Sequence, residues 1–361
     1  LGPAFDQNLS DRIHNDKTPM RDSGQLLEIV HQALVKGGFD VEAIYRRLGY
    51  NAEALPLRQM RTPHELQAFF WETVEAVTHD PDVGLHLCPH APVFRGEVME
   101  YLMLSSSTFG EGMERTVKYL RLVSDAMNLR LVHDEKGTRC VLKGSNIQAP
   151  QLRHTEIMMA HQLIRFGQTV TEGKYAPSRV RLRTSRRAPQ AEYDAIFGCP
   201  VEFEGEESEI WFDSKLLAYH SPRSSPELLQ LHEEHAEKRL TTLKRQDLIE
   251  KIRAVFAQRL ELDRCDLEEV AKELQIPPRR LRFELARAGT SFSQVLADFR
   301  FALARQLLAR TKEPVEDIVY LTGFSEPSTF YRAFKRWSGM TPVQYRDSKK
   351  NRPARAIDPT D

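Results

Sequence analysis

The 361-residue chain has few cysteines and no long apolar run, and both absences narrow its class. Its four cysteines, Cys88, Cys140, Cys199 and Cys265, are scattered without a close pair. A disulfide framework is therefore not expected, and a reducing, cytoplasmic location is predicted. No stretch of about 18 apolar residues occurs, so the sequence predicts no transmembrane helix and no membrane partner.

Signatures of catalysis and of cofactor binding are also missing. No glycine-rich phosphate loop follows an expected strand, and no Ser–His–Asp or paired-carboxylate arrangement stands out. We therefore predict no enzyme activity, no cofactor and no metal. The nearest approach to a metal site is the run His86-Leu-Cys88-Pro-His90, whose alternate residues would share one face of a strand. Because Pro89 and Pro92 interrupt regular structure, a packed or exposed loop is the favoured interpretation.

The net charge is zero, but its distribution is uneven. Residues 241–361 carry 23 Lys and Arg against 17 Asp and Glu, a net charge of +6, so the first 240 residues carry −6. A basic C-terminal end favours contact with phosphates and release of their counterions. The excess is modest, and it supports nucleic-acid binding without proving it.

Two short apolar patterns around a glycine lie between residues 314 and 346. Pro314 suits the start of the first helix, and Gly323 suits its left-handed end. The apolar face of this helix comprises Ile318, Val319 and Leu321. A second helix then carries an aromatic stripe at helical spacing, formed by Phe330, Phe334 and Trp337.

The opposite side of this second helix is polar and basic. It carries, or is flanked by, Ser328, Thr329, Tyr331, Arg332, Lys335 and Arg336. Two short helices around a glycine turn, the second basic outside, are typical of a helix-turn-helix that reads DNA. Periodicity alone is equally compatible with an ordinary helical hairpin whose basic face is solvated.

A similar pattern precedes it. Asp266 and Glu269 form a candidate capping box for a helix over about 266–274. The next helix, within 276–289, directs Leu281 and Leu285 inward. Its outward residues are Arg279, Arg280 and Arg282, with Phe283 beside them. Ser291 then caps a long helix to about Arg310, whose expected stripe is Phe292, Val295, Leu296, Phe299, Leu303 and Leu307.

The downstream segment resembles the signature of the AraC family of bacterial transcription regulators. The matching positions are Gly323, Phe324, Ser328, Phe330, Arg332, Phe334, Lys335, Gly339, Pro342, Tyr345 and Arg346. The resemblance implies an all-α domain of two helix-turn-helix units joined by a linker helix. Its implied partners are double-stranded promoter DNA and RNA polymerase, and activation is the expected outcome. Two recognition helices on one face of B-DNA should lie about 34 Å apart.

The resemblance also assigns roles. In the second unit it places Ser328 and Arg332 at base edges and Lys335 at phosphate, with Tyr331 stacking or contacting the backbone. In the first helix-turn-helix, Arg279, Arg280 and Arg282 are expected to make the corresponding contacts with DNA. The first unit departs from the family, because Pro277 replaces the usual Ser cap and Phe283 stands where a basic residue is frequent. An aromatic side chain can press on a thymine methyl but cannot form the bidentate bond of Arg to guanine. We therefore expect altered contacts in the first unit.

The N-terminal two-thirds of the chain is predicted to be α+β, with helices first and a mostly antiparallel sheet later. Helical patterns run from Gln25 to Leu122, with a third helix opened by Pro63, and return at 153–170 and 193–197. Strand patterns occupy 128–133, 139–143 and 178–184. A further hairpin is expected from 201–204 and 209–212.

This part resembles the arabinose-binding-type N-terminal domain of a large AraC subgroup, which includes regulators of ornithine use and of quorum sensing or virulence. The resemblance spans about Val30 to Lys215. The segments that match are Gly96–Glu111, Tyr119–Leu122, Ala176–Val180 and Tyr193–Val201. It implies a small-molecule effector, a homodimer, or both. Nothing in these residues argues for arabinose.

The predicted organisation has five parts. Residues 1–22 are a disordered or engineered tail, with Met20 as a conceivable native start. Residues 23–220 form the regulatory and dimerisation domain, and 221–243 form a linker and helix. Residues 244–348 form the DNA-binding domain, and 349–361 are a second tail.

Several interpretations compete with these. A Met- and aromatic-rich stripe (Met99, Met103, Met113, Met127, Met158, Met159, Phe166) could line an apolar pocket, although plain core is the commoner case. The arginines at 179, 181, 183, 186 and 187 could bind an anion, although a solvated strand face is commoner. For the whole protein, the alternatives are an AraC-type DNA-repair methyl-acceptor enzyme, which needs an activated Cys, or a protein-interaction module without DNA.

Overall fold

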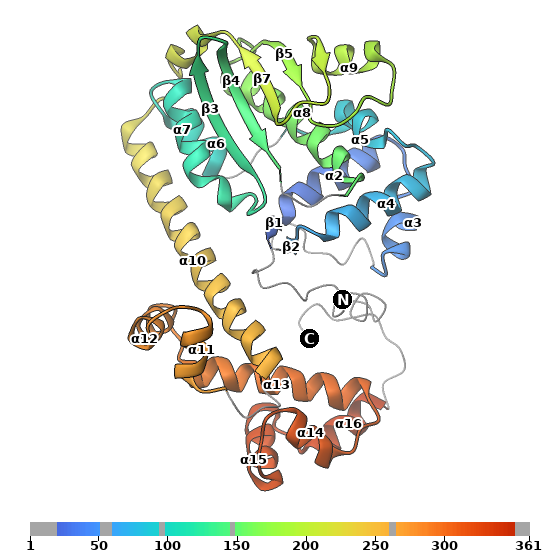
Figure 1. The fold of residues 1–361 in the computed structure, drawn as a ribbon, viewed down its shortest axis with the longest axis vertical. Helices are drawn as coiled ribbons and strands as arrows, with labels where there is room; N and C mark the ends of the chain where they lie inside the picture. Colours follow the sequence, from blue (N-terminus) through green and yellow to red (C-terminus); the bar gives the residue numbers. More distant parts are fainter. Residues whose placement is uncertain (1–19, 51–59, 94–97, 145–148, 260–264, 351–361) are drawn as a thin grey trace. The chain divides into compact units, whose positions relative to one another are not determined.

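The computed structural model describes residues 20–50, 60–93, 98–144, 149–259 and 265–350 (Figure 1). It divides into two compact units, Leu1–Leu240 and Thr241–Asp361. None of the described helices is long and apolar enough to cross a membrane.

The first half of unit 1 is helical, as predicted. Its helices are α2 (Gly24–Lys36), α3 (Val41–Arg47), α4 (Leu66–Thr78), α5 (Val83–His86), α6 (Val98–Ser105) and α7 (Phe109–Tyr119). Local caps fix several starts, because the side chains of Asp40 and Thr108 accept hydrogen bonds from the third amide beyond them. The short 3₁₀ turns η3 (Cys88–His90), η4 (Leu120–Leu122) and η5 (Ser214–Ala218) complete these connections.

The N-terminal boundary differs from the prediction. β1 (Arg21–Ser23) pairs antiparallel with β2 (Arg61–Pro63), so Pro63 ends a strand and does not open a helix. Asp22, placed in the predicted tail, is only 2% exposed and lies in the unit's interior. Residues 1–19 and 351–361 lie outside the described residues.

Unit 1 continues with a five-stranded sheet of order β3-β4-β7-β5-β6. The strands are β3 (Asn128–Asp134), β4 (Gly137–Lys143), β5 (Pro177–Arg181), β6 (Val201–Glu202) and β7 (Ser208–Phe212). One apolar row crosses all five strands in register: Leu131, Cys140, Ile210, Val180 and Val201. α8 (Leu152–Val170) and α7 pack with the sheet, and this row belongs to their shared core.

The predicted hairpin of 201–204 with 209–212 is wrong. β6 pairs in parallel with β5, and β7 inserts between β4 and β5. The chain between β5 and β6 contains α9 (Gln190–Phe197), and a helix is the usual crossover for a parallel pair. The acidic segment after β6 therefore passes β5 to reach β7 and is not a tight hairpin turn.

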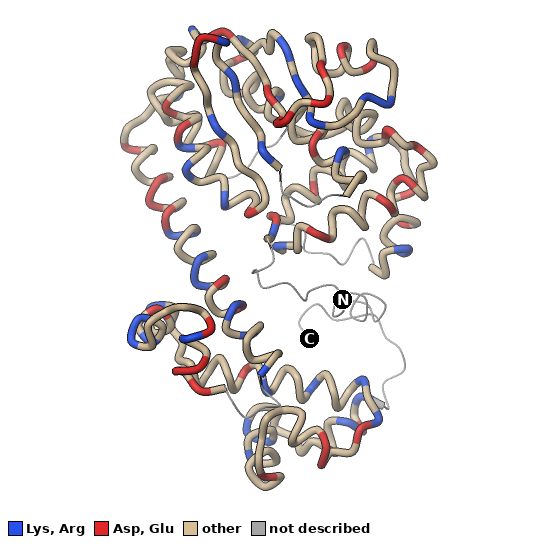
Figure 2. Tube along the Cα trace, viewed as in Figure 1, with Lys and Arg blue, Asp and Glu red and all other residues tan. Residues whose placement is uncertain are grey.

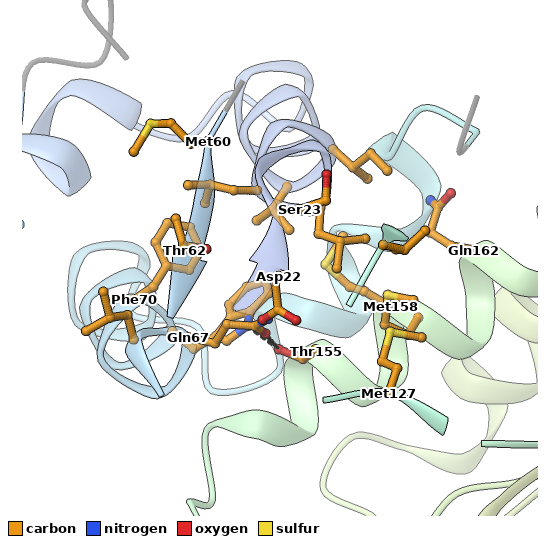
Figure 3. A pocket seen from close by; sticks show the side chains of 18 of the residues that line it. Asp22, Ser23, Met60, Thr62, Gln67, Phe70, Met127, Thr155, Met158 and Gln162 are labelled. Carbon is orange, nitrogen blue, oxygen red and sulfur yellow. Dashed lines mark hydrogen bonds between the residues drawn. The ribbon is translucent and has the colours of Figure 1, made fainter. Parts of the chain in front are cut away.

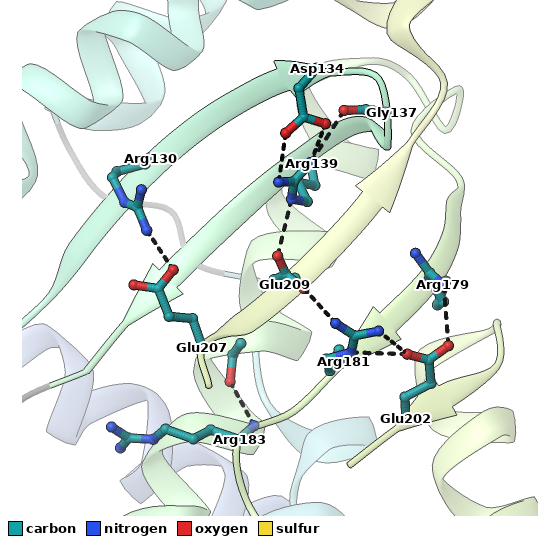
Figure 4. Close-up of polar contacts among 11 residues, drawn as sticks. Arg130, Asp134, Gly137, Arg139, Arg179, Arg181, Arg183, Glu202, Glu207 and Glu209 are labelled. Atoms are coloured by element: carbon teal, nitrogen blue, oxygen red, sulfur yellow. Dashed lines mark hydrogen bonds and ion pairs between the residues drawn. The ribbon is translucent and has the colours of Figure 1, made fainter. Parts of the chain in front are cut away.

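The other face of the sheet carries a ladder of alternating charges (Figure 4). Arg139 contacts Asp134 at 2.8 Å and Glu209 at 3.0 Å, and Arg181 bridges Glu209 at 3.3 Å and Glu202 at 2.7 Å. The hydrogen bonds from Arg139 lower the pKa of Asp134 to about 2. Carboxylates of the chain therefore already hold these guanidinium groups, and Arg179 pairs with Glu202 while stacking over Trp211. The arrangement is a half-buried network of internal ion pairs, which argues against an anion site at Arg179 and Arg181.

The His86–His90 run is helical. His86 ends α5 and Cys88 begins η3, so the three residues do not alternate on a strand. His86 contacts Asp80 and Glu192, while the Cys88 thiol is buried and donates to the Gly84 carbonyl at 3.3 Å. Among the described residues no group of His, Cys, Asp and Glu could hold a metal ion.

Unit 2 is helical throughout its described part. α10 (Pro226–Arg259) runs past the predicted end at 243, because Leu248, Ile252 and Val255 continue the helical spacing. It is followed by α11 (Leu267–Glu273), α12 (Pro278–Arg287), α13 (Phe292–Arg310), α14 (Val315–Leu321), α15 (Pro327–Ser338) and α16 (Pro342–Lys350). The last helix extends two residues into the predicted second tail.

The side chains of α13 divide between two cores. Phe292, Val295 and Phe299 pack with α10, α11 and α12, whereas Phe301, Ala304 and Leu308 pack with α14 and α15. Each member of the first group lies nine positions before a member of the second. At about 100° per residue, nine positions rotate a side chain to the opposite side of the helix. The single predicted stripe is therefore two stripes, and α13 holds one helix-turn-helix on each side.

Candidate nucleic-acid interface

The first helix-turn-helix consists of α11 and α12. The Asp266 side chain accepts a hydrogen bond from the Glu269 amide at 2.7 Å, which confirms half of the predicted capping box. The Glu269 carboxylate does not complete the box and contacts Arg259 at 3.3 Å. α12 begins after Pro277 without a side-chain cap, as the sequence predicts, and buries Leu281 and Leu285.

The second helix-turn-helix consists of α14 and α15. Val315, Ile318 and Val319 are buried, and Gly323 adopts the expected left-handed conformation with φ of 73°. In α15, Phe330 and Phe334 are fully buried and Trp337 packs beside them. Gly339 ends the helix with φ of 74° and donates to the Lys335 carbonyl.

Opposite these buried faces lie the predicted DNA-contacting residues. Those exposed to solvent are Arg279, Arg280, Arg282, Phe283, Ser328, Thr329, Arg332, Lys335 and Arg336. Tyr331 is half-buried and its ring packs edge-on against Phe330, so it is partly a core residue. The structure brings the two predicted groups onto α12 and α15, one on each helix-turn-helix.

The cationic side chains differ in whether the protein already neutralises them. Arg332, Lys335 and Arg336 on α15 have no hydrogen-bond or ion-pair partner for their side chains among the described residues, and the same holds for Arg279 and Arg280 on α12. Arg282, in contrast, contacts Glu268 of α11 at 2.9 Å. Charges left without a partner in the protein are available to phosphates and base edges.

Phe283 adds to the difference between the two helix-turn-helix motifs. Its ring is 58% exposed, which is unusual for phenylalanine, and Arg287 lies over it at 5.6 Å. α15 has no exposed aromatic ring of this kind at its basic face among the described residues. The surface of α12 therefore combines an apolar plate with arginines, while that of α15 is purely polar and basic.

Both recognition helices also start in the same way. Each has a proline in its first turn, Pro278 or Pro327, and neither has a side-chain cap at its start. The amides of Arg279, Arg280 and Ser328 thus remain available to an acceptor, and phosphate is a common one at helix starts; the Thr329 amide already donates to the Glu326 carbonyl at 3.2 Å. Figure 2 shows Lys and Arg along α12 and α15, with acidic residues on the neighbouring α11 and α14.

Several residues of the signature have a structural role. Phe324 packs against Phe330 and Trp337, and Tyr345 packs edge-on against Phe334. Arg346 donates to the Glu313 carbonyl at 2.6 Å. These positions hold α15 and α16 in place and do not belong to the exposed basic face.

Two bracing residues were not predicted from the sequence. Arg300 of α13 donates to the Gly323 carbonyl at 2.8 Å and stacks over Phe324, which fixes the turn before α15. Arg305 donates to the Tyr345 hydroxyl at 3.0 Å. Their partners lie 23 and 40 positions away, so no spacing within α13 could have indicated them.

Comparison with known proteins gives consistent matches. A family model described as the arabinose-binding domain of AraC transcription regulator, N-term, matches residues 38–221, and a helix-turn-helix domain model matches residues 270–348. The ornithine utilization regulator of Pseudomonas aeruginosa is 30% identical over 278 residues, covering 76% of this chain and 81% of that protein. The transcriptional regulator VirS of Mycobacterium tuberculosis is 28% identical over 324 residues, covering 84% and 93%. The crystal structure of transcriptional regulator CdpR from Pseudomonas aeruginosa aligns at 22% identity with a TM-score of 0.39, over 84% of this chain and 97% of that one.

Proposed function

Because this chain belongs to the AraC family of DNA-binding transcription regulators, we propose that α12 and α15 read two successive major-groove segments of a promoter. Its N-terminal domain is of the arabinose-binding type. The observation that supports this proposal is a set of five exposed cationic side chains, divided between α12 and α15, that have no partner in the described part of the chain.

The roles within each helix follow from chemistry. Arg332 and Ser328 contact base edges, because the guanidinium group can form a bidentate bond to guanine. Lys335 and Arg336 contact phosphates, as do the free first-turn amides of both helices. On α12, Arg279 and Arg280 do the corresponding work, and Phe283 presses on a thymine methyl. Arg282 contributes less, because Glu268 already neutralises it.

The N-terminal unit controls this reading. In our proposal it senses a small molecule and joins two copies of the chain, and the DNA-bound protein activates transcription through RNA polymerase in the cytoplasm. The relatives named as regulators support the coarser role of transcription regulation.

The protein works by binding and not by catalysis. A methyl-acceptor mechanism needs a thiol whose pKa is lowered. In three of the four cysteines burial has the opposite effect: it raises the pKa of Cys140 to about 12, that of Cys199 to about 11, and that of the Cys88 thiol further. We therefore expect DNA binding to be indifferent to a thiol reagent and to a chelator.

Selection of random duplex DNA by the full chain tests the proposal. The bound pool is sequenced after several rounds at roughly physiological salt. Two short enriched blocks, centred about ten base pairs apart, are expected when both helices read DNA. A single block would mean that α12 does not read sequence. No enrichment together with weak salt dependence would indicate a protein-interaction module.

A further inference from the structure

We infer that the N-terminal unit binds a small, hydrocarbon-rich molecule that carries a hydrogen-bond donor, and that it discriminates against sugars and carboxylates. The site is a cavity of about 190 Å³ between α2, α4 and α8, bordered also by α3 and β3 (Figure 3). The inference rests on the proposed sensing role of this unit and names the class of ligand.

The wall of this cavity is almost entirely carbon and sulfur. α2 contributes Leu26, Leu27, Ile29 and Val30; α4 contributes Leu66, Phe69, Phe70 and Trp71; α8 contributes Met158, Met159, Leu163 and Phe166. Methionines also line it from other elements, at Met60, Met99 and Met127. Flexible thioether side chains suit an apolar ligand of irregular shape. Of the methionine-rich stripe seen in the sequence, Met103 and Met113 belong to the plain core, while the other members face this space.

Polar side chains also line the cavity at Ser23, Thr62, Thr116 and Gln162, and a further group forms a hydrogen-bonded cluster. The Asp22 carboxylate accepts hydrogen bonds from Ser124 Oγ at 2.5 Å, from His64 Nδ1 at 2.7 Å and from the Gln67 amide. Gln67 accepts in turn from the Thr155 hydroxyl at 2.5 Å, and Thr155 accepts from Trp71 Nε1 at 2.8 Å. Figure 3 shows Asp22, Gln67 and Thr155 together at the cavity, facing the side that carries Met127 and Met158.

The direction of these bonds sets the preference for the ligand. The donors of the cluster are directed at Asp22, at Gln67 or at Thr155, so they are not available to a ligand. A carboxylate offers about four acceptor positions, of which Asp22 uses three. The remaining capacity accepts a hydrogen bond from a ligand hydroxyl or ammonium. A ligand carboxylate would face the Asp22 carboxylate and be repelled by it.

Tyr45 supplies a second unused polar group. It lines the cavity, is 2% exposed, and its hydroxyl has no hydrogen-bond partner among the described residues. Burial raises the pKa of Tyr45, so this hydroxyl stays protonated. Buried polar atoms are rarely left without a partner, and a ligand that carries one polar group would provide it.

The same wall excludes a sugar. A pentose carries a hydroxyl on nearly every carbon, and each one buried against Leu, Phe or Met would lose its hydrogen bonds to water without replacement. The cavity is also small, only somewhat larger than the roughly 150 Å³ apolar cavity that holds benzene. A monocyclic aromatic with a short polar arm, about nine non-hydrogen atoms, matches this volume.

Calorimetric titration of the full chain with three probes tests the inference. The probes are 2-phenylethanol, phenylacetate and L-arabinose, which differ in head group or in the number of hydroxyls. We expect 2-phenylethanol to bind, phenylacetate to bind at least about tenfold more weakly, and L-arabinose to give no binding heat. Equal affinity for the alcohol and the acid, preference for arabinose, or no binding of 2-phenylethanol would each overturn it.

A matched pair of variants locates the site. Val30→Trp inserts an indole into the cavity, whereas Val35→Trp makes the same change on the same helix at a position that is 55% exposed and outside the lining. Binding of 2-phenylethanol should fall at least about tenfold in the first variant and stay unchanged in the second. Asp22→Asn should narrow the preference for the alcohol over the acid. Unchanged binding by a folded Val30→Trp protein would place the ligand elsewhere and refute the site.

Selection of DNA on the same preparations separates this inference from the proposed function. Sequence-selective DNA binding without any response to 2-phenylethanol would remove the ligand class and leave the regulator intact. Binding of 2-phenylethanol without selection of DNA would leave the cavity assignment standing and contradict the proposed reading by α12 and α15.

Discussion

Replacement of Arg332 by alanine is the sharpest test of how α15 reads DNA. The side chain is exposed and has no partner among the described residues. Its removal therefore creates no cavity and leaves no buried group unpaired, and the free energy of unfolding should change by less than about 0.5 kcal/mol. Any larger effect on DNA binding then reports a contact with DNA.

The expected magnitude follows from the type of contact. A bidentate bond from Arg to guanine contributes about 1–3 kcal/mol of discrimination, so Arg332→Ala should weaken cognate binding by roughly 5- to 150-fold. Binding to unrelated duplexes should fall much less. Lys335→Ala is the matched control on the same exposed face: it should weaken binding to all sequences alike and reduce the salt slope by about one.

Fluorescence anisotropy with the selected operator and a scrambled duplex, each at several salt concentrations, measures both quantities. An equal loss on the two duplexes for Arg332→Ala would refute its base-reading role. Arg280→Ala on α12 extends the comparison to the first helix-turn-helix. If it costs as much discrimination at its half-site as Arg332→Ala does at the other, the expected difference in base reading between the two helix-turn-helix motifs is wrong.

Three further predictions concern stability. Phe334→Ala removes a fully buried ring from the second core of unit 2, so the free energy of unfolding should fall by about 3–5 kcal/mol in denaturant titration, and a smaller loss would mean that the core closes over the gap. Gly84→Ala places a Cβ 2.6 Å from the His154 Cβ, so unit 1 should lose about 1–3 kcal/mol, whereas Gly144→Ala, whose Cβ would meet only the Arg183 guanidinium at 3.4 Å, should cost little. Burial lowers the pKa of His154 and of His161 to about 4, below about 6.5 in the unfolded chain, so their contribution is present above pH 6.5 and is lost as the pH falls toward 4. The loss should reach about 3 kcal/mol for each histidine by circular dichroism. Residues 241–361 contain no histidine, so in a Trp71→Phe, Trp211→Phe variant the fluorescence of the remaining Trp337, which reports on unit 2, should change little with acid; equal acid sensitivity of the two units would contradict this.

The sequence predicted best what depends on short-range periodicity. The positions of α12 to α15, the buried faces of α12, α14 and α15 and the glycine at the end of α15 follow from spacing within a few turns; the two opposite faces of α13 did not. Strand pairing does not follow from such spacing. The residues of β6 and β7 alternate in the same way whether they pair with each other or with β5, and only the path of α9 decides it.

Other features depend on partners distant in the sequence. The brace from Arg300 to the Gly323 carbonyl and the neutralisation of Arg282 by Glu268 appear only when separate helices are brought together. The cavity could not be predicted from the sequence for another reason, because the apolar residues that line a pocket are of the same types as those that fill a core. Met113 and Met158 are both buried methionines on helices, but of the two only Met158 lines the cavity.

The nine-residue offset along α13 gives the length of this helix a consequence for the evolution of the protein. One residue inserted between Phe299 and Phe301 would turn one recognition helix relative to the other by about 100° and shift it by about 1.5 Å. The major groove of DNA faces the same side only once per helical turn. The altered protein would therefore need two half-sites with a different spacing along the helix, and not merely a different base sequence. Under the proposed reading, substitutions on α12 or α15 would change the operator base by base. A change in the length of α13 would instead detach the regulator from all of its sites at once, and a lineage can therefore retune its targets gradually only while this helix keeps its length.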